Sequence, residues 1–342
     1  MTEPSGATWQ ARLKPPYDWA TVQSLIMVAL AGVGYGLLTR ALFVLGDALG
    51  GGDMFELMSS AFLLLTPTAI GAITVYASAD AEKRSWWYYG CMPWAVVTLF
   101  AFSSGLMLIE GLICIVMALP LFCLGGSVGG LLMGAFLRWR GRQAGVLHSF
   151  IALPLLVGAL PGGSDPNAYG TATVSIDIAA PPAVVWQQLY NVGQIAPEEV
   201  PDAFIYRIGV PKPRSGQTVT TPEGRVRQVR WHKGVHFEEV VTDWQPERTI
   251  GWTYRFAKDS IPPGALDEHV TLGGRYFGLE ATHYTLTPIA GGTRLTLQIG
   301  YRVSTDFNWY SHWLGQLALR DFAGAVLVLY RNRSEAAQYA MH

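Results

Sequence analysis

The chain has 342 residues and a formal net charge of −1, and 14% of its residues are charged, against about 25% in an average soluble protein. Half of the residues are hydrophobic, which predicts an integral membrane protein. The near-neutral charge excludes the basic footprint of a nucleic-acid-binding protein, so we expect no nucleic-acid partner. The three cysteines lie in apolar stretches and form neither a disulfide framework nor a zinc pattern, so we expect neither a metal nor a cofactor.

Five apolar stretches follow a polar segment, residues 1–20, which we expect in the cytoplasm. A helix needs about 20 apolar residues to cross roughly 30 Å of hydrocarbon. The fourth stretch is long for one span, and the fifth is short and contains Pro154. The predicted spans cover about 21–46, 57–77, a stretch after Tyr89 to about 103, 106–137 and 144–160. The sequence therefore predicts an α-helical transmembrane bundle over residues 21–160.

The charges between these spans predict their orientation. The loop 47–56, between the first and second predicted spans, carries acidic residues and no basic ones. Basic loops face the cytoplasm in membrane proteins. We therefore expect a multi-pass protein of the cell's inner (plasma) membrane with its C-terminal domain on the periplasmic (extracytoplasmic) side, unless the short fifth stretch does not cross, in which case that domain is cytoplasmic. The basic residues lie in alternate connecting segments: Arg12, Lys14, Lys83, Arg84, Arg138, Arg140 and Arg142.

Two features inside the predicted spans indicate contacts between helices: a pair of charged residues and a row of glycines. Arg40 and Glu110 are charged residues that the predicted topology places near the outer leaflet. We expect them to pair, because an unpaired charge in the bilayer is costly. Gly126, Gly130 and Gly134 recur every four residues, a spacing typical of tightly packed membrane helices.

A second domain over 171–342 follows a linker, 161–170, that is rich in proline and glycine. Apolar residues then alternate with polar ones, which predicts a half-buried first strand. A helix after Pro181 and Pro182 and a helical turn near 194–200 come next. The further predicted elements are strands over 203–210, 216–221, 224–232, 235–244, 248–256, 276–288 and 293–304 and a helix over 306–338.

The opening TATVSIDIAAPPAVVWQQLYNV, the strand pair VTDWQPERTIGWTY and the hairpin YTLTPIAGGTRLTLQIGYRV occur here in order before the terminal helix. This arrangement resembles the START-like superfamily, also called SRPBCC, which includes polyketide cyclases and lipid-transfer domains. The resemblance implies an α+β helix-grip fold, in which a curved antiparallel sheet wraps a long C-terminal helix. It also implies an interior that holds a hydrophobic ligand. The membrane spans beside it resemble bacterial proteins in which such spans precede this domain.

Polar groups among the predicted inward-facing aromatic residues are the candidates for ligand contacts. Glu239 or its neighbour Glu238 can point inward, and a buried carboxylate could act as an acid or base. His232 and His236 flank a predicted turn, so they are not a convincing zinc pair. The segment 257–275 is either a lid or a plain loop. The expected ligand-binding residues are Tyr206, Glu239, Trp252, Tyr254, Tyr284 and Trp313.

Three functions follow as hypotheses. The first is a membrane-anchored domain that binds a lipid or another hydrophobic small molecule, for transfer or sensing, with membrane lipids as its other partner. The second is a cyclase- or aromatase-type enzyme that uses Glu239, His283 and Tyr254. The third is a structural or regulatory subunit that docks on a membrane-protein partner. The sequence has no serine–histidine–acid arrangement, phosphate loop or redox motif, which favours binding over catalysis.

Overall fold

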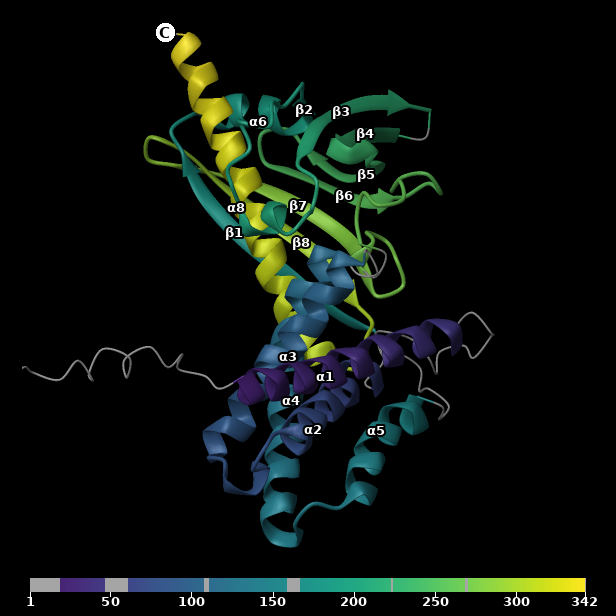
Figure 1. The fold of residues 1–342 in the computed structure, drawn as a ribbon. Helices are drawn as coiled ribbons and strands as arrows, with labels where there is room; N and C mark the ends of the chain where they lie inside the picture. Colours follow the sequence, from purple (N-terminus) through teal and green to yellow (C-terminus); the bar gives the residue numbers. More distant parts are fainter. Residues whose placement is uncertain are drawn as a thin grey trace, which may run out of the picture. The chain divides into compact units, whose positions relative to one another are not determined.

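A computed structural model describes residues 19–46, 61–107, 111–158, 167–222, 224–267 and 270–341 (Figure 1). The chain divides into two compact units. The first comprises residues 1–107 and 118–162, and the second comprises 108–117 and 163–342. The described part of the short segment, residues 111–117, thus groups with the C-terminal domain, although it lies in the fourth predicted span.

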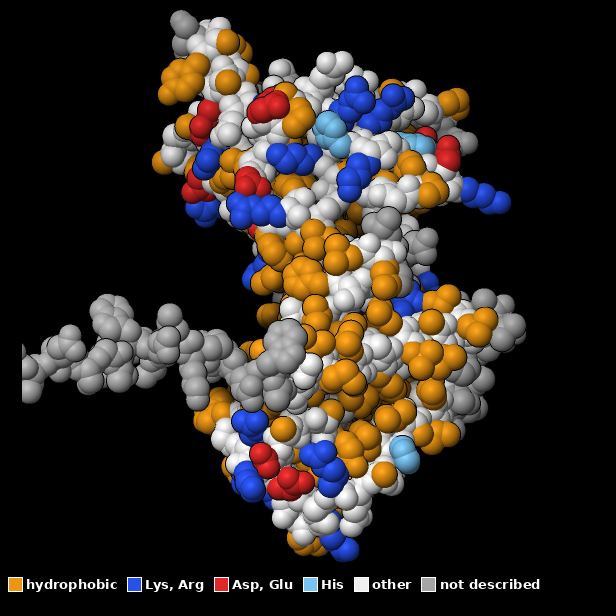
Figure 2. Space-filling view, in the orientation of Figure 1, with side chains coloured by type: hydrophobic (Ala, Val, Ile, Leu, Met, Phe, Trp, Pro, Cys, Tyr) orange, Lys and Arg blue, Asp and Glu red, His pale blue; other side chains and the backbone are white. Residues whose placement is uncertain are grey.

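The first unit is helical and strongly apolar. Three of the described helices include stretches long and apolar enough to cross a membrane: Val22–Gly46, Trp86–Leu106 and Leu112–Arg140, the last of which begins in the second unit. Ala61–Ala77 and Ala144–Gly158 are shorter apolar helices. Figure 2 shows hydrophobic side chains over much of the visible face of this unit. Its elements are α1 (Trp19–Gly46), η4 (Ala61–Leu65), α2 (Thr66–Ala77), η5 (Ala81–Lys83), α3 (Trp86–Leu106), α4 (Leu112–Arg140) and α5 (Ala144–Gly158).

A described helix lies in each of the five predicted spans, but those in the second and fifth are shorter than the three candidate membrane spans, and the bounds differ in two further places. The fourth helix runs from Leu112 to Arg140 and not from 106 to 137, and residues 108–110 before it lie outside the described residues. Residues 57–60, where the second span was predicted to begin, also lie outside them. Glu110 is among the residues not described, so its pairing with the buried Arg40 stays a prediction.

The glycine stripe of α4 allows two helices to approach closely, as predicted. A Cβ atom added at Gly130 would overlap the backbone oxygen of Tyr89 in α3, and one at Gly134 would overlap the Tyr89 ring. At Gly126 it would meet Val97 at 3.2 Å. Small residues at such positions allow helices to pack backbone against side chain without a large hydrophobic driving force.

The second unit contains one eight-stranded antiparallel sheet and a long helix. The sheet order is β1-β8-β7-β6-β5-β4-β3-β2, so the first and last long strands are neighbours. Helix α8 runs along the curled sheet (Figure 1). The elements are β1 (Ala168–Ile178), α6 (Pro182–Tyr190), β2 (Asn191–Val192), α7 (Phe204–Arg207), β3 (Pro213–Thr221), β4 (Gly224–Trp231), η6 (His232–Gly234), β5 (His236–Gln245), β6 (Thr249–Arg255), β7 (Phe277–Ile289), β8 (Gly292–Val303) and α8 (Asn308–Ala340).

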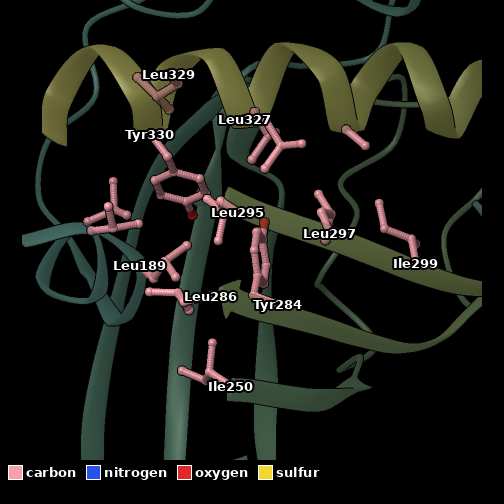
Figure 3. Packing of buried hydrophobic residues seen from close by; sticks show 14 of the residues in the cluster. Leu189, Ile250, Tyr284, Leu286, Leu295, Leu297, Ile299, Leu327, Leu329 and Tyr330 are labelled. Atoms are coloured by element: carbon pink, nitrogen blue, oxygen red, sulfur yellow. The ribbon is translucent and has the colours of Figure 1, made fainter. Parts of the chain in front are cut away.

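The core of this unit lies between the sheet and α8. In Figure 3, Leu327 and Tyr330 of α8 point toward Tyr284 and Leu295 of the sheet. The buried residues of α8 include Ala323, which is fully enclosed. Alternating residues of β7 and β8 complete the cluster because successive side chains of a strand point to opposite faces. This arrangement confirms the predicted helix-grip fold.

One predicted strand is wrong. Residues 203–210 contain the four-residue helix α7 and not a strand. Asp321 of α8 accepts a hydrogen bond from the Ile205 N–H at 2.8 Å, which satisfies a free amide of this helical turn. Ile205 and Ile208 are buried in a separate cluster, so tertiary packing overrides the strand propensity of the segment. The predicted helical turn near 194–200 contains turns only.

Candidate functional site

A buried pair of opposite charges lies on the inner side of the sheet. Arg227 of β4 is the register partner of Glu239 of β5, and Glu239 is in turn the partner of Tyr254 of β6. Arg227 is 6% exposed and Glu239 is 5% exposed. Burying two charges is costly unless they are paired and hydrogen-bonded. The three adjacent strands therefore bring polar groups together inside an otherwise apolar interior.

Arg227 makes contacts with both the sheet and the helix. Its Nη1 donates to Oε2 of Glu239, and its Nη2 donates to the hydroxyl of Tyr330 in α8 at 3.2 Å. The guanidinium carbon lies 5.1 Å from the centroid of the Trp252 ring, within the range of a cation–π contact. Arg227 thus links β4, β5, β6 and α8 at one point.

Gly216 of β3 makes room for this guanidinium group. A Cβ atom at Gly216 would lie 2.5 Å from the Arg227 Cζ and 2.9 Å from its Nε. Real Cβ atoms do not approach other heavy atoms so closely. The lack of a side chain at this position therefore leaves the space that the Arg227 guanidinium occupies.

Aromatic rings surround the ion pair. The centroids of Trp252 and Tyr284 are 5.4 Å apart, and Tyr284 meets Tyr330 edge to face at 5.8 Å. The hydroxyl of Tyr254 lies 2.5 Å from that of Thr282 in β7, within hydrogen-bond distance. These rings give the polar groups a low-dielectric surrounding, which strengthens each electrostatic contact.

Burial shifts the acid–base behaviour of this cluster. Burial raises the pKa of Glu239, while the Arg227 guanidinium and the Trp252 indole partly oppose that increase. Burial would lower the pKa of Arg227, but the charge of Glu239 and the Tyr330 hydroxyl raise it above its ordinary value. Burial also raises the pKa of Tyr254. The arginine is therefore a permanent cation, and the carboxyl group holds a proton more readily than an exposed one.

The cluster contains a donor that the described residues do not satisfy. The Nε atom of Arg227 is buried and has no hydrogen-bond partner among the described protein groups. A buried donor without a partner costs about 1–3 kcal/mol. The tyrosine hydroxyl of Tyr206, at the edge of the same core, is buried and unsatisfied in the same way. An ordered water molecule is a common partner for a buried polar group that the protein itself does not satisfy.

Four of the six predicted ligand residues lie together at this cluster: Glu239, Trp252, Tyr254 and Tyr284. Tyr206 belongs to α7 and packs against another part of α8, with its ring 6.3 Å from that of Phe322. Trp313 is 55% exposed on α8 and is not part of the buried cluster. His283, a candidate acid or base of the enzyme hypothesis, lies on the outer face of β7 and is exposed.

Sequence reasoning missed Arg227 and Tyr330, although both had a signal. Arg227 shares the period-two inward face of β4 with Val229 and Trp231, so the alternation alone placed a charged residue inside. Tyr330 follows Ala323 and Val326 on the buried stripe of α8 at helical spacing. A basic residue on the apolar face of a strand was the feature to look for.

The segment 257–275 packs against the domain. Ala265 and Leu266 are buried beside the strands and α8. The Asp267 carboxylate accepts a hydrogen bond from the backbone N–H of Cys114, in the first turn of α4, at 3.3 Å. A carboxylate at a helix N-terminus satisfies a free amide and complements the helix dipole. Whether this segment acts as a lid stays a prediction.

The structure adds no support for a metal site at His232 and His236. Within the described residues there is no group of three or more His, Cys, Asp or Glu side chains that could hold a metal ion. His236 lies 3.6 Å from the Asp259 carboxylate, on an exposed part of the surface.

Residues 170–327 match the protein family described as polyketide cyclase / dehydrase and lipid transport. The C-terminal domain combines this match with a curled antiparallel sheet and a long C-terminal helix, and it therefore resembles the START-like superfamily. No curated protein matches the chain.

Solved structures similar to the chain cover about half of it. A protein from Mesorhizobium loti is 18% identical, with 47% of this chain and 96% of that chain covered and a TM-score of 0.26. The protein XoxI from Bacillus cereus is 15% identical, with 51% and 99% covered and a TM-score of 0.30. A protein of unknown function from Staphylococcus aureus is 10% identical, with 51% and 98% covered and a TM-score of 0.32. At these scores the fold assignment depends on the sheet order and the family match.

Proposed function

We propose that the C-terminal domain binds a lipid or another hydrophobic small molecule between the sheet and α8, with the polar end of that molecule at Arg227 and Glu239. The observation that carries the proposal is the buried Nε donor of Arg227, which lacks a partner among the described groups. The aromatic rings around it would contact the apolar part of the ligand. Ligand sites in proteins typically combine such apolar walls with a few placed polar groups.

The description of the matched family supports this proposal, because it includes lipid transport. The three helices long enough to span a membrane also support it. They would hold the domain at the bilayer from which a hydrophobic ligand comes. Transfer between membranes and sensing of a ligand are both compatible with this arrangement.

The experiment is native mass spectrometry of the full chain, purified in mild detergent from its membrane. We expect the wild-type protein to carry a co-purified hydrophobic molecule. The double variant Arg227→Met/Glu239→Met should lose it, with about tenfold weaker binding or more, because a hydrogen bond to a charged group contributes about 1.5–3 kcal/mol. Replacing both buried charges with apolar side chains of similar volume is often neutral for folding.

The matched control is Arg255→Met/Glu238→Met. Arg255 and Glu238 are also register partners on adjacent strands, at 3.3 Å, but both are exposed. This control variant should keep the ligand. A wild-type protein that is always empty, or equal occupancy in the buried double variant, would contradict the proposal.

A second candidate is catalysis on the same ligand, as in a cyclase-type enzyme. The raised pKa of Glu239 favours it, because a carboxyl group with a raised pKa is better suited to exchange a proton with a substrate than an ordinary exposed one. Tyr254, the register partner of Glu239, would be the neighbouring hydroxyl. The variant Glu239→Gln separates the two functions: ligand recovered unchanged in wild type and variant indicates binding alone, whereas a product found only in wild type indicates catalysis.

We also propose that the domain lies outside the cytoplasm. The first turns of α4 belong to the same unit as the domain, and Ile113 packs in a cluster with Ala203 and Ala325 of that domain. The other end of α4 carries Arg138 and Arg140, which the positive-inside rule assigns to the cytoplasm. Opposite ends of a spanning helix lie on opposite sides, so these contacts favour a periplasmic domain. A C-terminal reporter active only in the periplasm would test this; activity of a cytoplasmic reporter instead would contradict it.

A further inference from the structure

The first turns of α8 have an exposed apolar stripe. Trp309, Trp313 and Leu317 recur every four residues and are 69%, 55% and 50% exposed. The opposite side of the same turns is buried: a Cβ atom at Gly315 would lie 3.3 Å from the Tyr301 ring. The exposed stripe is therefore not the side of α8 that completes the domain core.

This part of α8 has no charged residue. The sequence between Asp306 and Arg320 contains neither Lys, Arg, Asp nor Glu. Exposed tryptophans without neighbouring charges are uncommon on a surface that faces water, and large apolar patches usually mark interaction sites. Tryptophan and tyrosine are enriched where a membrane meets water, because their rings are partly apolar and partly polar.

The length of α4 places the level of the membrane surface. Its 29 residues extend about 43 Å, more than the roughly 30 Å of the hydrocarbon layer. Arg138 and Arg140 do not belong in hydrocarbon, so the buried stretch ends near residue 137 and begins about 20 residues earlier, near residue 118. The turns 112–117 then lie in the interfacial layer, and they are the part of α4 that groups with the domain.

A hydrogen bond connects α8 to the end of these interfacial turns of α4. The hydroxyl of Tyr310 donates to the backbone oxygen of Met117, the residue just before the hydrocarbon-buried stretch of α4. The Tyr310 ring lies 5.7 Å from the Trp309 ring and 6.1 Å from the Trp313 ring, so the three form one aromatic group. Where α4 crosses the membrane, this aromatic group would therefore lie at the interfacial depth that tryptophan and tyrosine prefer.

We infer that the stripe Trp309, Trp313 and Leu317 is a membrane-contacting surface, and that its partner is the headgroup and upper acyl region of the bilayer into which α4 inserts. The inference depends on α4 crossing the membrane and not on the ligand proposed for the domain interior. It assigns Trp313 to contact with lipid in the bilayer and not with a ligand inside the domain. One helix then packs against the domain core on one side and against the bilayer on the other.

The test is the depth of spin labels in the full chain, reconstituted in nanodiscs of phosphatidylcholine and phosphatidylglycerol. Labels are attached at Trp313→Cys, Leu132→Cys and Tyr339→Cys in a variant without native cysteines. Power saturation compares collisions with oxygen, which is concentrated in lipid, and with a water-soluble nickel complex. We expect the label at 313 to favour oxygen over nickel several-fold more than the label at 339, which is on the same helix.

The label at 132 reports whether α4 crosses, because Leu132 is exposed and lies within the predicted hydrocarbon-buried stretch. It should be the deepest of the three. A label at 313 that is as water-accessible as the one at 339 would overturn the inference. A label at 313 shielded from both reagents would also overturn it, because protein and not lipid would cover the stripe, and so would a water-accessible label at 132.

A second measurement avoids cysteine variants that could fail to fold. The conservative double variant Trp309→Phe/Trp313→Phe is reconstituted in the same nanodiscs with brominated phosphatidylcholine, which quenches tryptophan at the membrane. The quenched fraction of fluorescence should fall relative to wild type. The control Trp186→Phe removes a buried tryptophan of the domain core, and its quenched fraction should not fall. An unchanged fraction in the double variant would contradict the inference.

Discussion

The ion pair between Arg227 and Glu239 allows a prediction with a sign and a size. Removing one partner leaves the other as an unpaired buried charge, which typically costs about 3–5 kcal/mol. For a domain of this size, 1 kcal/mol shifts the melting temperature by roughly 2–4 °C. The single variants Arg227→Met and Glu239→Met should therefore each melt about 6–20 °C below wild type. The double variant should recover most of that loss, because it buries no charge.

The assay is thermal unfolding of the full chain in detergent, followed by tryptophan fluorescence after co-purified molecules have been washed out. The exposed pair Arg255 and Glu238 is the reference, since exposed pairs contribute about 0–1 kcal/mol. Its single variants should shift the melting temperature by at most about 4 °C. Single variants of the buried pair that melt like wild type would refute the burial of these charges. A double variant as unstable as the singles would refute their pairing.

Three further predictions concern contacts near the site. Gly216→Ala should destabilise the domain by about 1–3 kcal/mol, because the new methyl group overlaps the buried guanidinium of Arg227. The control is Gly193→Ala, whose new methyl group meets no atom within 4 Å and which should be nearly neutral in the same melting assay. Asp267→Ala removes the acceptor for a first-turn amide of α4, so it should cost about 0.5–2 kcal/mol and speed hydrogen exchange at that amide. The hydrogen bond from Arg333 holds the pKa of Glu199 below its ordinary value of 4.5. The stability that this pair contributes is therefore complete above pH 4.5 and is lost as the pH falls below that value. Glu199→Gln should flatten this part of the acid-unfolding profile, and an unchanged profile would contradict the pairing.

Local patterns in the sequence were sufficient to predict most of the fold. The period-two alternation of β1 and the turns before β5 and β8 predicted the succession of strands along the chain, and the apolar stripe predicted α8. The segment 203–210 was mispredicted because its apolar residues fit a strand equally well, and the hydrogen bond from Ile205 to Asp321 that favours a helical turn joins residues 116 positions apart. Such contacts leave no local pattern.

The site was predictable only in part. Glu239 and Trp252 lie on strands whose inward faces follow from alternation, so they could be assigned to the interior. The contact of Arg227 with Tyr330 connects β4 to α8 across 103 residues and depends on how the sheet curls around the helix. Trp313 was predicted to contact a ligand. Its position on the exposed side of α8 could be seen only in the structure, where Gly315 on the opposite side packs against the sheet.

Ligand binding is tested most directly by an experimental structure of the full chain purified from its native membrane. We predict density for an elongated molecule between the sheet and α8, with a polar atom within hydrogen-bond distance of the Nε of Arg227. An interior filled only by side chains, in a protein prepared without delipidation, would contradict ligand binding at this cluster and would leave the ion pair a structural role.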